Sequence, residues 1–92
     1  MPTTPLTLTL YTRANCSLCD DAAALLDRLA DSLRFRWTPV DVDRDPALRA
    51  RFDSLLPVIA LGEEVLATAP LSEPVVRAAL ARVARSAEGS RD

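Results

Sequence analysis

Two cysteines, Cys16 and Cys19, stand two residues apart and are the only cysteines in the chain. A pair with this spacing can form and break a disulfide, supply two ligands to a metal, or lie buried as inert apolar side chains. The chain has no histidine, the residue that most often serves as general base or metal ligand. Because zinc needs four ligands, two cysteines could hold a metal only with carboxylates such as Asp20 or with a second chain.

The composition indicates what kind of protein carries this pair and in which compartment it works. The chain has 92 residues, of which 49% are hydrophobic and 26% charged, as expected for a single globular domain over residues 1–92. A formal net charge of −2 gives no basic surface for nucleic acid or an acidic membrane. The start, MPTTPLTLTLY, has no signal-peptide pattern, and no apolar run is long enough to cross a bilayer. We expect a cytoplasmic monomer, where a cysteine pair is more often catalytic or metal-binding than structural.

The elements on either side of the pair follow from hydrophobic periodicity. Residues 6–12 alternate apolar residues with threonine, which predicts a strand. From Cys16 to about Ser32 the period is helical, so the pair lies where a strand gives way to a helix. The apolar face expected for this helix consists of Leu18, Ala22, Leu25, Leu26, Leu29 and Leu33.

The remainder of the chain predicts five more elements. Residues 35–42 form a second strand, placed at a sheet edge because Pro39 cannot donate a hydrogen bond. Asp45-Pro46 opens a short helix. Residues 56–61 and 64–68 form a hairpin, and Ser72 caps a last helix whose inner residues are Val76, Ala79, Leu80 and Val83. We expect an ordered core over about 6–86 and a flexible tail over 87–92.

The predicted order of elements is β-α-β-α-β-β-α. The first helix is long enough to join parallel strands through a right-handed crossover, and the hairpin must add antiparallel strands. The expected fold class is therefore α/β, with a four-stranded mixed sheet and helices on both faces.

With C-x-x-C between the first strand and helix, the sequence resembles the glutaredoxins, specifically the short glutaredoxin-like proteins of bacteria with a thioredoxin-like fold. The resemblance covers about residues 6–84. It rests on Leu8-Thr9-Leu10-Tyr11-Thr12 leading into Cys16-Ser17-Leu18-Cys19-Asp20, Val40-Asp41-Val42-Asp43 with Asp45-Pro46, Leu56-Pro57-Val58, and the final hairpin and helix.

The resemblance implies a small thiol–disulfide oxidoreductase acting on protein or low-molecular-weight disulfides. Cys16 would be the nucleophile and Cys19 the resolving cysteine. Pro57 would follow a cis peptide bond and face the cysteines, and the backbone of Leu56 would pair with the substrate. No bound cofactor or metal is implied, and glutathione is a candidate co-substrate. The family's Gly-Gly, which helps to hold glutathione, is missing from residues 67–73.

Four further residues are candidates for contact with the substrate or the sulfurs. Ser17 and Leu18 would shape the surface of the turn, and Ser17 could donate a hydrogen bond to sulfur. Arg13, the nearest cation, is either a solvated loop residue or a partner of the Cys16 thiolate or of glutathione. Tyr11 is either a packing residue or an aromatic wall near the cysteines.

Two other interpretations remain open at the level of sequence. The cysteines could be inert in a non-catalytic binding module that docks another chain near Pro57. They could also share an iron–sulfur cluster between two copies of the chain.

Overall fold

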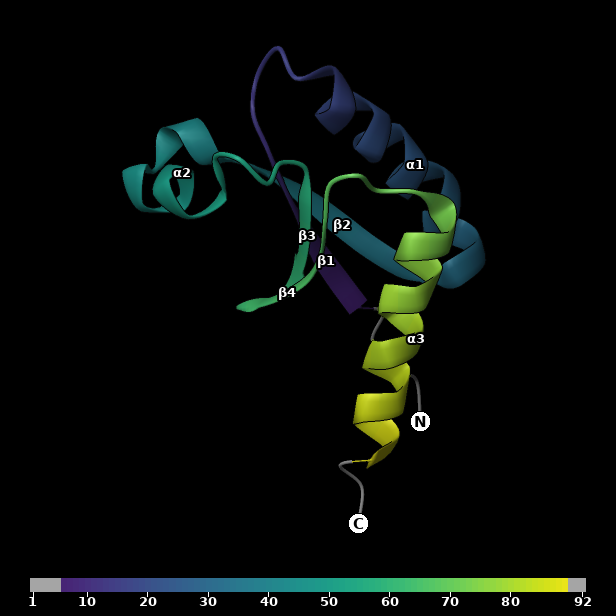
Figure 1. The fold of residues 1–92 in the computed structure, drawn as a ribbon. Helices are drawn as coiled ribbons and strands as arrows, with labels where there is room; N and C mark the ends of the chain where they lie inside the picture. The colour runs from purple at the N-terminus through teal and green to yellow at the C-terminus, as the bar shows by residue number, and fades with distance from the viewer. Residues whose placement is uncertain (1–5, 90–92) are drawn as a thin grey trace.

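The computed structural model describes residues 6–89. Its elements follow the predicted order, with one short 3₁₀ turn (η1) added after the second strand (Figure 1). They are β1 (Leu6–Thr12), α1 (Ser17–Leu33), β2 (Phe35–Asp41), η1 (Val42–Arg44), α2 (Pro46–Phe52), β3 (Val58–Leu61), β4 (Glu64–Thr68) and α3 (Glu73–Gly89). Because α3 continues to Gly89, the tail expected from residue 87 begins as helix, and residues 90–92 lie outside the described part.

The four strands form one mixed sheet in the order β2-β1-β3-β4. β1 pairs in parallel with β2, whereas β3 is antiparallel to both β1 and β4. The prediction of a mixed sheet with the second strand at its edge is confirmed. At the opposite edge the register between β3 and β4 shifts, so that Leu66 is an extra residue in β4. The Leu66 carbonyl accepts a hydrogen bond from Arg82 Nη2 at 2.6 Å.

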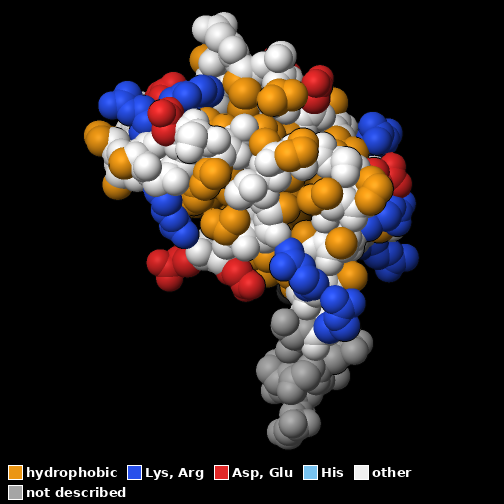
Figure 2. Space-filling view, viewed as in Figure 1, with side chains coloured by type: hydrophobic (Ala, Val, Ile, Leu, Met, Phe, Trp, Pro, Cys, Tyr) orange, Lys and Arg blue, Asp and Glu red, His pale blue; other side chains and the backbone are white. Residues whose placement is uncertain are grey.

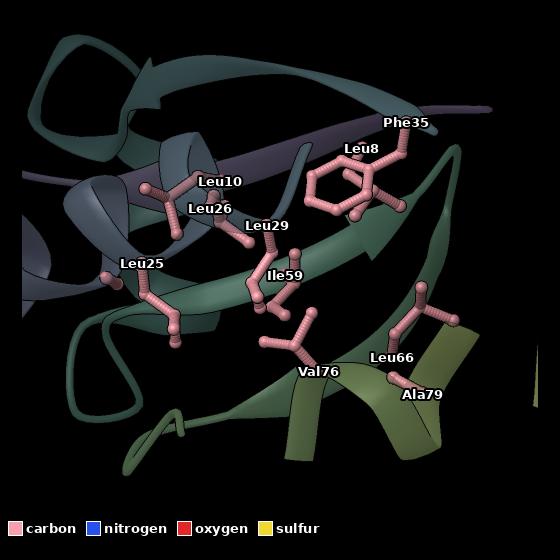
Figure 3. Close-up of a cluster of buried hydrophobic side chains, with 11 residues drawn as sticks. Leu8, Leu10, Leu25, Leu26, Leu29, Phe35, Ile59, Leu66, Val76 and Ala79 are labelled. Carbon is pink, nitrogen blue, oxygen red and sulfur yellow. The ribbon is translucent and has the colours of Figure 1, made fainter. Parts of the chain in front are cut away.

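Side chains that alternate along the strands build a separate cluster on each face of the sheet. Leu8 and Leu10 of β1 and Ile59 of β3 point toward α1 and α3, whose buried leucines, valine and alanines complete the main core (Figure 3). Val58, the neighbour of Ile59, points to the other face and packs with Phe52 of α2. Helices therefore cover both faces of the sheet, as expected.

The first turn of α1 differs from the prediction. Leu18 was expected on the buried face, but it is 58% exposed, and Cys19 takes the inner position with 1% exposure. Both residues lie three or four positions before Ala22, so helical periodicity allows either to continue the apolar stripe. Only one of them can face the sheet, and the structure places Cys19 there.

Local contacts hold α1 in place. The ring N–H of Trp37 in β2 donates to Asp27 Oδ1 of α1 at 3.0 Å. Arg28 of α1 pairs with Glu73 at the start of α3 at 3.6 Å. The helix ends at Arg34, which adopts the left-handed conformation with φ 59° and donates its N–H to the Ala30 carbonyl.

The surface combines apolar and charged groups. On the side shown in Figure 2, hydrophobic side chains gather over the centre and charged side chains of both signs lie around the rim. Within residues 6–89, no helix is both long and apolar enough to cross a membrane.

Candidate functional site

Cys16 and Cys19 are joined by a disulfide. Their Cα atoms are 5.2 Å apart, within the range that a disulfide spans. Cys16 is the N-cap of α1 and is half-buried, whereas Cys19 lies inside the first turn and is 1% exposed. The two sulfurs therefore differ in access, and only Cys16 is open to solvent.

The start of α1 places hydrogen-bond donors around the Cys16 sulfur. The backbone N–H of Cys19 donates to Cys16 Sγ at 3.1 Å. Free N–H groups and the positive end of a helix dipole both stabilise a negative charge at an N-cap. The turn that delivers Cys16 to this position passes through Asn15, whose φ of 58° lies in the left-handed region that asparagine tolerates better than most residues.

Ser17 and Leu18 occupy the two positions between the cysteines. Both are exposed, so they form the surface that an incoming disulfide would meet. In the described residues no hydrogen bond joins the Ser17 hydroxyl to either sulfur. Leu18 presents apolar surface at the mouth of the pair.

Leu56 and Pro57 lie immediately before β3. The Leu56–Pro57 peptide bond is cis, as the family resemblance implied. Pro57 is fully buried, and Leu56 is half-buried against the cluster of Val42, Phe52 and Val58. The preceding carbonyl, that of Leu55, accepts a hydrogen bond from the N–H of Ala69 at 3.3 Å.

A second cis bond joins Ala69 to Pro70, after β4. The sequence analysis did not anticipate it. The only signal in the sequence is the proline itself, and prolines are far more often trans.

Arg13 pairs with two carboxylates. Its Nη2 donates to Asp43 Oδ1 at 2.9 Å and to Asp53 Oδ1 at 2.6 Å, and within the described residues it makes no hydrogen bond to the sulfurs. Its contact with glutathione stays a prediction. The hydrogen bond to Arg13 lowers the pKa of the Asp43 carboxyl, and the same bond raises the pKa of Arg13. Arg13 thus ties the loop before Cys16 to η1 and to the end of α2.

Neither aspartate was singled out from the sequence. They lie 30 and 40 residues from Arg13, and no local pattern connects an arginine with carboxylates so distant in the chain. The contact depends on β1 and β2 lying side by side in the sheet, which brings the residues that follow them together.

Tyr11 is a packing residue. Its ring stacks on that of Phe52 with centroids 4.4 Å apart and planes 23° apart. The guanidinium of Arg51 lies 4.7 Å from the centroid of the Phe52 ring. The aromatic side chain at the end of β1 therefore supports the loop before β3 through α2.

Within residues 6–89, no three or more His, Cys, Asp or Glu side chains lie together in a way that could hold a metal ion. The chemistry that the site's own atoms can perform is exchange between two thiols and a disulfide.

Comparisons with known proteins agree with this geometry. A family model described as "Glutaredoxin-like domain (DUF836)" matches residues 7–81. An uncharacterized protein of Mycobacterium tuberculosis, Rv0508, is 36% identical over 78 residues, covering 79% of this chain and 80% of that protein.

Solved structures show the same fold. Protein Ne2328 from Nitrosomonas europaea superposes with a TM-score of 0.72 at 26% identity, covering 85% of this chain and 94% of that one. Thioredoxin 1 from Thermosipho africanus has a TM-score of 0.63 at 15% identity, covering 90% of this chain and 99% of that one, so the likeness extends to the thioredoxin fold.

Proposed function

Because the chain belongs to the glutaredoxin-like domain family, with a thioredoxin-like fold and a C-x-x-C pair, we propose that it is a small cytoplasmic thiol–disulfide oxidoreductase. One observation carries the proposal: the disulfide at the N-terminus of α1 joins a half-buried cysteine, Cys16, to a buried one, Cys19. Such an arrangement separates an attacking thiol from a resolving thiol. The electrons reside on the two sulfurs, so the reaction needs no bound cofactor and a single copy of the chain suffices.

In the reductive direction, the Cys16 thiolate attacks one sulfur of a substrate disulfide. A bond forms between Cys16 Sγ and that sulfur, and the other substrate sulfur leaves as a thiolate that takes up a proton. Cys19 then loses its proton and attacks Cys16 Sγ, which releases the second substrate thiol. Two electrons pass to the substrate, and Cys16 and Cys19 are left as a disulfide that an external dithiol reduces.

Three features of the site would assist these steps. The N–H of Cys19, 3.1 Å from Cys16 Sγ, would stabilise the attacking thiolate. The burial of Cys19 would keep the resolving thiol from reacting with outside disulfides before Cys16 does. Leu56 would offer backbone groups beside Pro57 to an extended substrate segment.

The proposal is tested by reduction of insulin with dithiothreitol as the donor. The wild-type protein should accelerate precipitation of the insulin B chain, and Cys16→Ser should abolish the acceleration. Cys19→Ser, reduced and freed of dithiothreitol before it meets insulin, should instead accumulate a mixed disulfide with insulin, visible as a mass adduct on Cys16, because no second thiol is present to resolve it. A wild-type protein that accelerates reduction of neither insulin nor small disulfides would refute the proposal.

A further inference from the structure

Two exposed acidic residues, Asp20 and Asp21, follow Cys16 in the first turns of α1, and Asp20 lies one helical turn from it. Asp20 is exposed, and its backbone N–H donates to the Cys16 carbonyl at 3.0 Å. Side chains four residues apart on a helix are neighbours, with Cβ atoms about 5–6 Å apart. Asp20 therefore places a negative charge one turn from the cysteine whose sulfur a substrate must reach.

The nearest cation along the chain does not offset this charge. Arg13 is occupied by two carboxylates, Asp43 at 2.9 Å and Asp53 at 2.6 Å. Within residues 6–89, the hydrogen bonds and ion pairs give Asp20 no basic partner. The positive end of α1 contributes only about half a unit charge, which is less than the charge on Asp20.

From these charges we propose that the site discriminates among disulfides by charge, favouring those with cationic flanks and disfavouring anionic ones such as glutathione disulfide. The proposal rests on the proposed function and names the substrate class: protein disulfides beside basic or neutral residues. Asp20 is then a specificity-determining residue, and the pairing of Arg13 with Asp43 and Asp53 removes the cation that an anionic substrate would use.

Coulomb's law gives the size of the effect. A substrate charge about 6–10 Å from Asp20, in a solvent-exposed site at low salt, changes the rate by about two- to threefold per unit charge. The cysteamine and glutathione halves of their disulfides carry one positive and one negative net charge, so they differ by two units. Removing the Asp20 charge should therefore change the ratio of their rates by about four- to ninefold.

The test uses three small disulfides of similar chemistry: cystamine, the neutral bis(2-hydroxyethyl) disulfide, and glutathione disulfide. Reduced protein is mixed with an excess of each at about 0.01 M ionic strength, where the Debye length is about 30 Å. The loss of the Cys16 and Cys19 thiols is followed by acid quench, alkylation and mass spectrometry. Each rate is divided by the rate at which 2-mercaptoethanol reacts with the same disulfide, which corrects for differences in the intrinsic reactivity of the three disulfides.

Cystamine should react fastest and glutathione disulfide slowest. Asp20→Asn should lower the ratio of the cystamine rate to the glutathione disulfide rate by about four- to ninefold. Asp31→Asn is the matched control, because it removes the same charge from the same helix about 22 Å from Cys16 along the axis. It should leave the order unchanged, and about 1 M salt should collapse the order in all three proteins.

Two results would overturn the inference while leaving the proposed function intact. One is a wild-type protein that reacts with all three disulfides at the same normalised rate or prefers glutathione disulfide. The other is an Asp20→Asn variant with the wild-type spread. If none of the three disulfides reacts with a wild-type protein that still reduces insulin, this inference fails and the proposed function stands. If insulin is not reduced either, both fail.

Discussion

Reduction of the Cys16–Cys19 disulfide should lower the stability of the protein only slightly, and the difference can be worked from the structure. The disulfide closes a loop with a sequence separation of 3. For a loop of about four residues, the chain-entropy relation gives about 2 kcal/mol of stabilisation in the oxidised protein. The reduced protein recovers part of this because the N–H of Cys19 and the end of α1 stabilise a Cys16 thiolate, a contribution of about 0.3–2 kcal/mol.

Asp20, one turn from Cys16, opposes the thiolate, and Arg13 is occupied elsewhere. We therefore assign about 1 kcal/mol to stabilisation of the folded, reduced protein by its thiolate. Subtracted from the roughly 2 kcal/mol that the disulfide contributes, this leaves the oxidised protein more stable by about 1 kcal/mol. In a thermal melt this corresponds to about 4–8 °C for a domain of this size. By thermodynamic linkage, the same difference makes the disulfide about fivefold easier to form in the folded chain than in the unfolded chain.

The assay is urea unfolding of the oxidised and reduced proteins at about pH 9.5, above the ordinary thiol pKa of about 8.5, where the thiolate contribution to stability is present. Unfolding is followed by the fluorescence of Trp37. This indole is bonded to Asp27 of α1 and should respond when the helix leaves the sheet. The double variant Cys16→Ser/Cys19→Ser should unfold identically with and without reductant. A reduced form more stable than the oxidised form by 1 kcal/mol or more would refute the reasoning. It would mean that the thiolate is held far more strongly than this site allows, as in a strong oxidant.

Three other changes test the packing and the electrostatics. Phe52→Ala should lower the free energy of unfolding by about 3–5 kcal/mol, because it removes a buried ring, only 2% exposed, that stacks on Tyr11. Phe52→Leu should lower it clearly less, and an equal loss of stability in the two variants would contradict this account. Because Arg13 lowers the pKa of Asp43 below its ordinary value of 3.8, the Arg13–Asp43 pair adds stability above about pH 4 that is lost as the pH falls through the lowered pKa. The melting temperature of Asp43→Asn should thus lie below that of the wild type at about pH 6, and the difference should shrink as the pH is lowered through the lowered pKa. A difference that stays constant with pH would exclude the pair as the cause. Arg34→Gly should raise the free energy of unfolding by up to about 1 kcal/mol in urea, because it relieves a left-handed residue with φ 59°; a decrease would show that the Arg34 side chain stabilises the fold.

The fold could be predicted because its signals are local. Alternating threonines mark β1, the 3.6-residue period marks α1, and Asp45-Pro46 marks the start of α2, where the Asp45 carboxylate accepts from the N–H of Ala47 at 2.9 Å. Each of these signals depends on residues within a few positions of one another. Their order then left few ways to arrange the strands.

The site could be predicted only in part, for the same reason. The cysteine pair and its place at a helix N-terminus were visible in the sequence, and the cis bond before Pro57 came through family resemblance. The surroundings of Arg13 were not visible, because its partners belong to η1 and to the end of α2. The exposure of Leu18 was missed because two adjacent residues satisfied the helical period equally well.

The hydrogen bond from Arg82 to the Leu66 carbonyl affects how copies of this protein meet one another at high concentration. Leu66 lies in β4, at one open edge of the sheet, and its carbonyl is already occupied. Pro39 lies in β2, at the other edge, and has no N–H to offer. A strand from a second molecule could therefore not pair with the Leu66 carbonyl at one edge or with an N–H of residue 39 at the other. Both features reduce edge-to-edge aggregation of sheets.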